Sequence, residues 1–161
     1  MEFNGCDFRQ ATSADGHELL RVQRRAIHTI DRAFYALREL ESWATGLTPE
    51  GYGLCIAEGE EIEVAVDGSD RITGFSSRMD GAILGLFVDP SAQGRGLGAA
   101  LLSRAEEGLI DGGARSSEIR ASLSAVRFYE RFGYAPVREV GAPTRGGLEL
   151  RFAEMSKYLN A

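Results

Sequence analysis

Residues 83–102 read ILGLFVDPSAQGRGLGAALL and form the most informative stretch of the chain. An apolar run typical of a buried strand comes first, followed by a turn that contains Gly94, Gly96 and Gly98 and then by an amphipathic helix. Glycine lacks a Cβ atom, so such a turn leaves backbone amides uncovered, and the helix start adds unpaired amides and a positive dipole end. The stretch therefore predicts a binding site for an anionic, phosphate-bearing ligand.

Two kinds of phosphate site fit this turn. A G-x-G-x-x-A pattern that begins at Gly94, with Glu118 about twenty residues further on, satisfies the dinucleotide-binding fingerprint. In a dinucleotide fold, however, the first glycine directly follows the strand, whereas here residues 89–93 intervene and Pro90 cannot donate to a sheet. A plain tight turn is a third interpretation, so a second motif is needed to decide among them.

That second motif lies downstream, where residues 122–134 read SLSAVRFYERFGY. Its Phe-Tyr-x-x-x-Gly-Tyr run, which includes Tyr129, follows the Gln-x-x-Gly-x-Gly spacing that begins at Gln93. In this order and at this separation the two segments resemble the GNAT superfamily of N-acetyltransferases, and the resemblance covers residues 60–157 continuously. It implies acetyl-CoA as the co-substrate.

The residue patterns predict the order of the elements. Apolar runs predict strands at residues 7–11, 62–66, 71–77, 83–88, 115–121, 135–140 and 148–156. Helical spacing and capping residues predict helices from Thr12 or Ser13 to near His28, at residues 37–44, from Thr48 onward, after the glycine-rich turn and around Tyr129. No linker or repeat interrupts the chain, so we expect one N-acetyltransferase domain over residues 1–161.

The resemblance implies an α/β (α+β) fold with a mixed, mostly antiparallel sheet and helices on both faces. In that fold the strand at residues 83–88 and the strand at residues 115–121 splay apart, and the acyl-pantetheine inserts into the gap like a missing strand. Backbone groups of Leu86, Phe87 and Val88 would then pair with the pantetheine amides. The same residues would also serve as an ordinary core strand.

The resemblance also places the pyrophosphate on the glycine-rich turn. The residues that match this segment are Gln93, Gly94, Arg95, Gly96, Leu97, Gly98 and Ala99. Gln93 stands where many relatives carry Arg, so one charge is missing, and the backbone amides are expected to supply most contacts. Arg95 either contacts the phosphates or faces water. Ser122 stands at a cofactor-contacting position where many relatives have Asn, and its hydroxyl can keep a hydrogen bond there.

Direct transfer of the acetyl group to a primary amine within a ternary complex is the reaction that the resemblance implies. The Tyr129 hydroxyl is expected near the thioester sulfur, where it would stabilise or protonate the departing thiolate, or else Tyr129 packs beneath the sheet. The attacking amine must lose a proton, and the candidates for the base are Asp80 and Glu118. The alternative is that both are solvated surface charges. Arg120 stands where a subgroup of relatives has Glu, which removes one carboxylate from the cleft.

Composition and charge are compatible with this reading. The chain has 161 residues with 43% hydrophobic content, and its 24 acidic and 18 basic residues give a net charge of −6. An acidic surface disfavours nucleic acid and anionic lipid. It also permits the approach of an amine, and the acceptor that the resemblance implies is a small-molecule or peptide amine. The alternative function is that of a regulatory module that binds acyl-CoA without turning it over. The oligomeric state is left open between a monomer and a homodimer.

The cysteines and the apolar segments lead to further expectations. Cys6 and Cys55 have no His or Cys at metal-ligand spacing, so no metal site is expected. Both thiols are expected to be free, and buried small hydrophobes are favoured over reactive nucleophiles. No apolar stretch is long enough to span a membrane, and residues 1–5 lack the features of a secretory signal. We therefore expect a cytoplasmic location.

Overall fold

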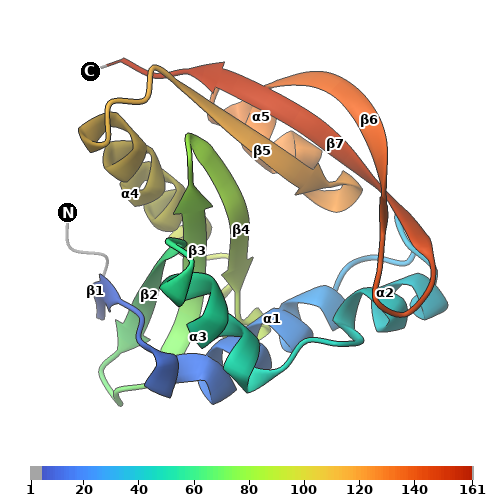
Figure 1. Cartoon of the computed structure of the whole chain (residues 1–161), viewed down its shortest axis with the longest axis horizontal. Coiled ribbons are helices and arrows are strands. Elements are labelled where there is room, and N and C mark those ends of the chain that lie inside the picture. The colour runs from blue at the N-terminus through green and yellow to red at the C-terminus, as the bar shows by residue number, and fades with distance from the viewer. Residues whose placement is uncertain (1–4, 161) are drawn as a thin grey trace.

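The computed structural model describes residues 5–160, whose strands form a seven-stranded sheet in the order β1-β2-β3-β4-β5-β7-β6 (Figure 1). The strands are β1 (Cys6–Gln10), β2 (Glu61–Asp67), β3 (Ile72–Met79), β4 (Ala82–Val88), β5 (Ser116–Ser122), β6 (Ala135–Pro143) and β7 (Glu149–Tyr158). Neighbouring strands are antiparallel except β4 and β5, which run parallel. The predicted mixed, mostly antiparallel sheet is confirmed.

Helices cover both faces of this sheet. They are α1 (Gly16–His28), α2 (Leu37–Ala44), α3 (Pro49–Ala57), α4 (Leu97–Asp111) and α5 (Val126–Arg131). Successive side chains of a strand point to opposite faces, so Val64 of β2 packs with residues of α1, whereas Ala65 packs with Leu97 and Leu101 of α4. As a result, α1 and α3 lie on one face of the N-terminal strands and α4 lies on the other.

Threonine side chains set the starts of two helical segments, as predicted. Thr12 caps a 3₁₀ turn (Ser13–Asp15) by accepting a hydrogen bond from the amide of Ala14 at 3.3 Å, and α1 follows at Gly16. Thr48 caps α3 by accepting a hydrogen bond from the amide of the third helical residue at 3.2 Å. These local contacts fix the helix boundaries because they satisfy amides that have no partner within the helix.

The central strands β4 and β5 separate after a short contact. Their pairing is limited to Ala82 with Glu118 and Ile83 with Ile119, whereas β3 stays paired with β4 as far as Val88. Beyond Ile83, one edge of β4 therefore has no strand partner among residues 5–160, and Figure 1 shows the two strands diverging. The predicted splay of the central strands is confirmed.

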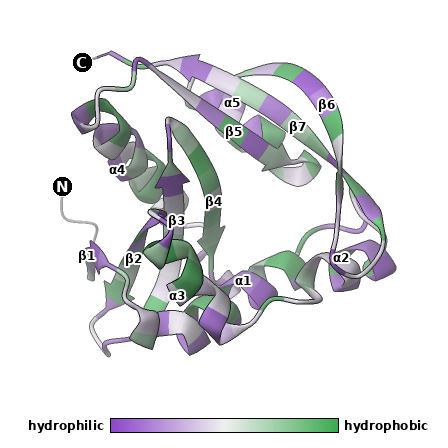
Figure 2. Ribbon diagram, in the orientation of Figure 1, coloured by the Kyte–Doolittle hydropathy of each residue, from purple (hydrophilic) through white to green (hydrophobic). Residues whose placement is uncertain are grey.

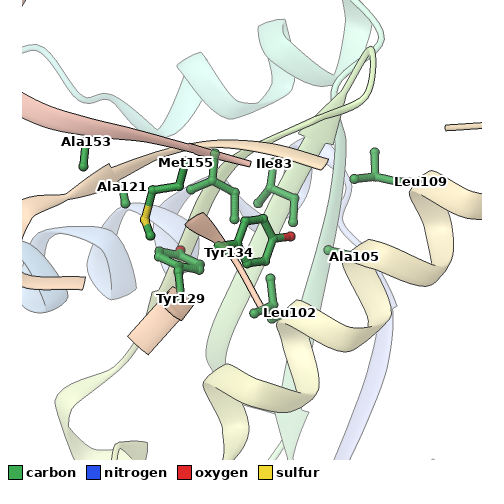
Figure 3. Packing of buried hydrophobic residues seen from close by; sticks show 10 residues of the cluster. Ile83, Leu102, Ala105, Leu109, Ala121, Tyr129, Tyr134, Ala153 and Met155 are labelled. Carbon is green, nitrogen blue, oxygen red and sulfur yellow. The ribbon is translucent and has the colours of Figure 1, made fainter. Parts of the chain in front are cut away.

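A hydrophobic cluster joins the C-terminal strands to α4 and α5. Its buried members are Ile83, Leu102, Ala105, Leu109, Ile119, Ala121, Tyr129, Tyr134, Ala153 and Met155, and Figure 3 shows how they pack. Figure 2 shows that β4 is hydrophobic along most of its length, whereas β5 alternates between hydrophilic and hydrophobic residues. This alternation places Glu118 and Arg120 on the exposed face of β5, opposite to the cluster.

Candidate functional site

The glycine-rich turn between β4 and α4 has the backbone shape that its sequence predicts. Gly94 and Gly96 adopt left-handed conformations with φ values of +79° and +85°. Side chains disfavour this region, so glycine at these two positions allows the turn without strain. Gly96 precedes the first residue of α4, and its carbonyl accepts a hydrogen bond from the Ala100 amide at 3.1 Å. The first amides of α4 therefore have no partner within the helix and are available to an anion.

A buried carboxylate holds the beginning of the turn in place. Asp89 directly follows β4, and its side chain is 2% exposed. It accepts hydrogen bonds from the amide of Ser91 at 3.0 Å and from the Ser91 hydroxyl at 2.7 Å. Arg21 and Arg25 of α1 donate to the same carboxylate at 2.8 Å and 3.0 Å. This cluster ties α1 to the residues that lead into the turn.

The environment of Asp89 favours its charged form. Burial by itself would raise the pKa of this carboxyl, but the hydrogen bonds from Ser91 and Arg25 outweigh burial and lower the pKa to about 2. Sequence reasoning missed this cluster, because the two arginines lie on a helix far away in the chain. The one local sign of this cluster in the sequence was Asp89 followed by Pro90 at the end of the strand.

A cavity of about 830 Å³ opens against the turn, and we call it the turn-side cavity. Of the predicted cofactor-binding residues, those that line it are Leu86, Phe87, Val88, Gln93, Gly94, Gly96, Leu97, Gly98, Ala99, Ser122 and Tyr129. Arg95 does not belong to this lining, and its guanidinium donates to the carbonyl of Ser91 at 2.7 Å. The side chain of Gln93 donates to the carbonyl of Val88 at 3.1 Å and closes the turn onto β4.

A second cavity of about 520 Å³ lies on the face covered by α2 and α3, and we call it the α3-side cavity. The β6–β7 turn and the exposed face of β5 complete its walls. The two cavities share six lining residues, namely Trp43, Leu86, Phe87, Ser122, Ala125 and Tyr129. Because these residues surround the gap between β4 and β5, the gap connects the two cavities.

Aromatic side chains form the wall between the α3-side cavity and the core. The rings of Trp43 and Phe152 meet edge to face with their centroids 5.4 Å apart. The ring centroids of Trp43 and Phe87 are 6.4 Å apart. The Tyr35 hydroxyl donates to the carbonyl of Arg151 at 2.6 Å and accepts from the amide of Leu123 at 3.0 Å. These contacts fix the C-terminal strands relative to the helices around the cavity.

Tyr129 lies where the two cavities meet, and its residue is 5% exposed. Its ring packs edge to face against Tyr134 with centroids 5.7 Å apart, as Figure 3 shows. Within residues 5–160, the Tyr129 hydroxyl makes no hydrogen bond. Every fully buried polar side-chain atom in this range has a partner, so the unpaired Tyr129 hydroxyl is not fully buried and reaches the cavity. Burial raises the pKa of Tyr129, so the hydroxyl stays protonated and can donate.

The carboxylates expected as base candidates lie outside both cavities. Asp80 occupies the turn between β3 and β4 with a φ of +51°, and Glu118 lies at the paired end of β5. Among the described residues that line the α3-side cavity, Glu60 is the one carboxylate. Only the packing of α3 against the sheet brings Glu60 to the cavity, so no local sequence pattern marked this residue.

The two cysteines differ from the expectation of burial. Both are free, as expected, but Cys55 is exposed and lines the α3-side cavity, whereas Cys6 is partly buried. Local desolvation and the neighbouring Glu60 carboxylate raise the pKa of the Cys55 thiol to about 11. A thiol with this pKa is protonated at neutral pH and is therefore a poor nucleophile.

Residues 5–160 contain neither a candidate metal cluster nor a candidate membrane-spanning helix. No group of three or more His, Cys, Asp or Glu side chains in this range has an arrangement that could hold a metal ion. The helices within the same range are too short or too polar to cross a membrane.

Comparisons with known proteins identify the family of this fold and site. Residues 32–159 match the family model of the acetyltransferase (GNAT) domain. An uncharacterised N-acetyltransferase of Methanocaldococcus jannaschii is 26% identical over 133 residues, which cover 78% of this chain and 59% of that protein. The chain belongs to the GNAT acetyltransferase family, a family of enzymes, as the two motifs predicted.

Solved structures share the fold over nearly the whole chain. A GCN5-related N-acetyltransferase from Rhodopseudomonas palustris has a TM-score of 0.89 at 22% identity, and the match covers 99% of each chain. The PaiA N-acetyltransferase from Thermoplasma acidophilum, solved in complex with coenzyme A, has a TM-score of 0.76 at 18% identity, and the match covers 96% of this chain and 99% of that one. The antiparallel pairing of β3 with β4 also differs from the parallel sheet of dinucleotide-binding folds.

Proposed function

We propose that the protein transfers the acetyl group of acetyl-CoA to a primary amine by direct attack within a ternary complex. The observation that carries this proposal is the pair of cavities that meet at the open end of the β4–β5 gap, with Tyr129 at their junction. The turn-side cavity suits the cofactor and the α3-side cavity suits the acceptor. The coenzyme A complex of the T. acidophilum relative supports the first of these assignments.

Acetyl-CoA fits the turn-side cavity by its chemistry. Backbone amides at Gly94, Gly96 and the start of α4 suit the pyrophosphate, because these amides have no hydrogen-bond partner within the described part of the chain and the helix end is positive. The free edge of β4 beyond Ile83 suits the pantetheine amides, which would extend the sheet as an extra strand. Arg95 lies outside the lining of this cavity and donates to the Ser91 carbonyl, so the backbone amides are the main phosphate donors in this proposal.

Tyr129 and Glu60 supply complementary proton chemistry in this proposal. The Tyr129 hydroxyl, kept protonated by its raised pKa, donates to the sulfur as the thiolate leaves. The amine reacts only after it loses a proton, and Glu60, directly or through water, is the carboxylate in position to accept one on the acceptor side. The acid therefore acts at the junction of the two cavities, and the base acts from the α3-side cavity.

Two measurements test the proposed reaction. Calorimetry with acetyl-CoA and with NAD compares the two phosphate ligands, and we expect binding of acetyl-CoA alone. Thiol release from acetyl-CoA is then followed with a panel of amino acids, amino-acid amides, polyamines and peptides. Binding of acetyl-CoA without thiol release to any amine would indicate a non-catalytic binding module, and binding of NAD alone would refute the cofactor assignment.

A further inference from the structure

The charges that line the α3-side cavity are the starting point for a narrower assignment. Among the described lining residues, the charged side chains are those of Glu60, Arg120 and Arg145. The cavity wall is therefore more basic than acidic, although the chain as a whole carries a net charge of −6. The global charge favours a cationic acceptor, whereas the local charge favours an acceptor that also carries an anionic group.

Arg120 is the more informative of the two arginines. The residue opposite it in the β5–β7 register is Glu154, whose carboxylate accepts a hydrogen bond from Arg138 of β6 at 2.7 Å. Glu118 lies on the same face of β5, but no ion pair joins Glu118 to Arg120. Within residues 5–160, the Arg120 guanidinium thus makes no hydrogen bond or ion pair and has its donors free toward the cavity.

Arg145 is held at another wall of the same cavity. It lies in the turn between β6 and β7, and its Nη1 donates to the carbonyl of Gly46 at 3.0 Å. Gly46 has a φ of +86°, and a Cβ atom there would lie 2.5 Å from the Arg145 side chain. Glycine at this position therefore allows the arginine to approach, and the remaining donors of the guanidinium stay available.

We infer that the acceptor is a small molecule that carries a carboxylate or a phosphate besides its amine, and that Arg120 binds the anionic group. This inference rests on the proposed acetyl transfer. Arg120 precedes Ser122, which lines both cavities, by two residues on one strand, so the two Cα atoms lie about 7 Å apart. Arg120 is thus anchored on β5 close to the gap, and this closeness favours short acceptors such as amino acids and aminoalkyl phosphates.

The test uses matched acceptors in the thiol-release assay. Amino acids are compared with their carboxamides, and O-phosphoethanolamine is compared with ethanolamine, with rates expressed per unprotonated amine. We expect the anionic member of at least one pair to have a kcat/KM tenfold or more above that of its neutral partner. The pair that shows this preference identifies the anion as a carboxylate or a phosphate.

Variants connect this preference to Arg120. In Arg120→Gln, the KM of the anionic acceptor should rise about tenfold to a hundredfold, because a charge-assisted hydrogen bond is lost. The KM of the neutral partner and the affinity for acetyl-CoA should not change. Arg71→Gln is the matched control, since Arg71 is an exposed arginine outside both cavities.

Different outcomes separate the two proposals. Acetylation of neutral amines or polyamines in preference to anionic ones would overturn the anionic acceptor and leave the proposed function standing. An equal effect of Arg120→Gln on both members of a pair would also overturn it. If acetyl-CoA binds but no amine of any series is acetylated, the proposed function fails, and the assignment of the acceptor fails with it.

Discussion

Replacing Asp89 with Asn removes the charge from the buried carboxylate that joins α1 to the glycine-rich turn. The pKa of this carboxyl falls from an ordinary value of 3.8 to about 2 in the folded protein. At 1.36 kcal/mol per pKa unit, this difference corresponds to about 2 kcal/mol of stability. Because Arg21 is 27% exposed and Arg25 is 49% exposed, water can solvate both guanidinium groups in the variant, which keeps the loss near this value.

The stabilisation depends on pH in a defined direction. A carboxyl with a lowered folded pKa stabilises the protein fully above its unfolded pKa, and this contribution is lost as the pH falls from about 4 toward 2. The contribution of Asp89 to stability is measured by urea unfolding of the unmodified protein and of Asp89→Asn at several pH values between 7 and 2.5. We expect a difference in unfolding free energy of about 2 kcal/mol at pH 7 that shrinks steadily below pH 4.

A control variant separates this effect from a general loss of charge. Asp7→Asn changes an exposed residue of β1, and within residues 5–160 the Asp7 side chain makes no hydrogen bond or ion pair. Its unfolding free energy should stay within about 0.5 kcal/mol of that of the unmodified protein at every pH. A difference for Asp89→Asn that is the same at pH 7 and pH 2.5 would refute the electrostatic explanation.

Three further predictions concern the cavities. Gly96→Asp should weaken acetyl-CoA binding about a thousandfold without unfolding the protein, because the new carboxylate and the pyrophosphate, about 4 Å apart, repel by about 4 kcal/mol. Calorimetry measures the change in affinity. Gly113→Asp, at a left-handed glycine beyond the other end of α4, is its control and should bind normally. Tyr129→Phe should lower kcat about a hundredfold with little change in acetyl-CoA affinity, and a loss confined to affinity would make Tyr129 a packing residue. Glu60→Gln should lower kcat while the acetyl-CoA affinity stays the same, and an unchanged kcat would assign the base elsewhere.

Local residue patterns were sufficient to predict the elements and the family. Apolar runs predicted the strands, and Thr12 and Thr48 predicted the starts of helical segments, because these signals act between residues close in the chain. The glycine-rich turn was predictable for the same reason, since left-handed backbone at Gly94 and Gly96 is a property of glycine itself. Gln93 to Ala99 and the run around Tyr129 predicted the GNAT family, which the family model confirms.

The chemistry of the acceptor side was decided mainly by tertiary structure. The family resemblance placed position 120 at the cleft, but Glu60 looks like an ordinary surface charge in the sequence. The two residues line one cavity because α3 and β5 border the same gap. The partners of Asp89 lie on α1, so no local pattern could reveal its lowered pKa. Sequence periodicity records which residues are buried, whereas long-range packing determines which charged groups meet, because Coulomb interactions depend on distance in space and on desolvation.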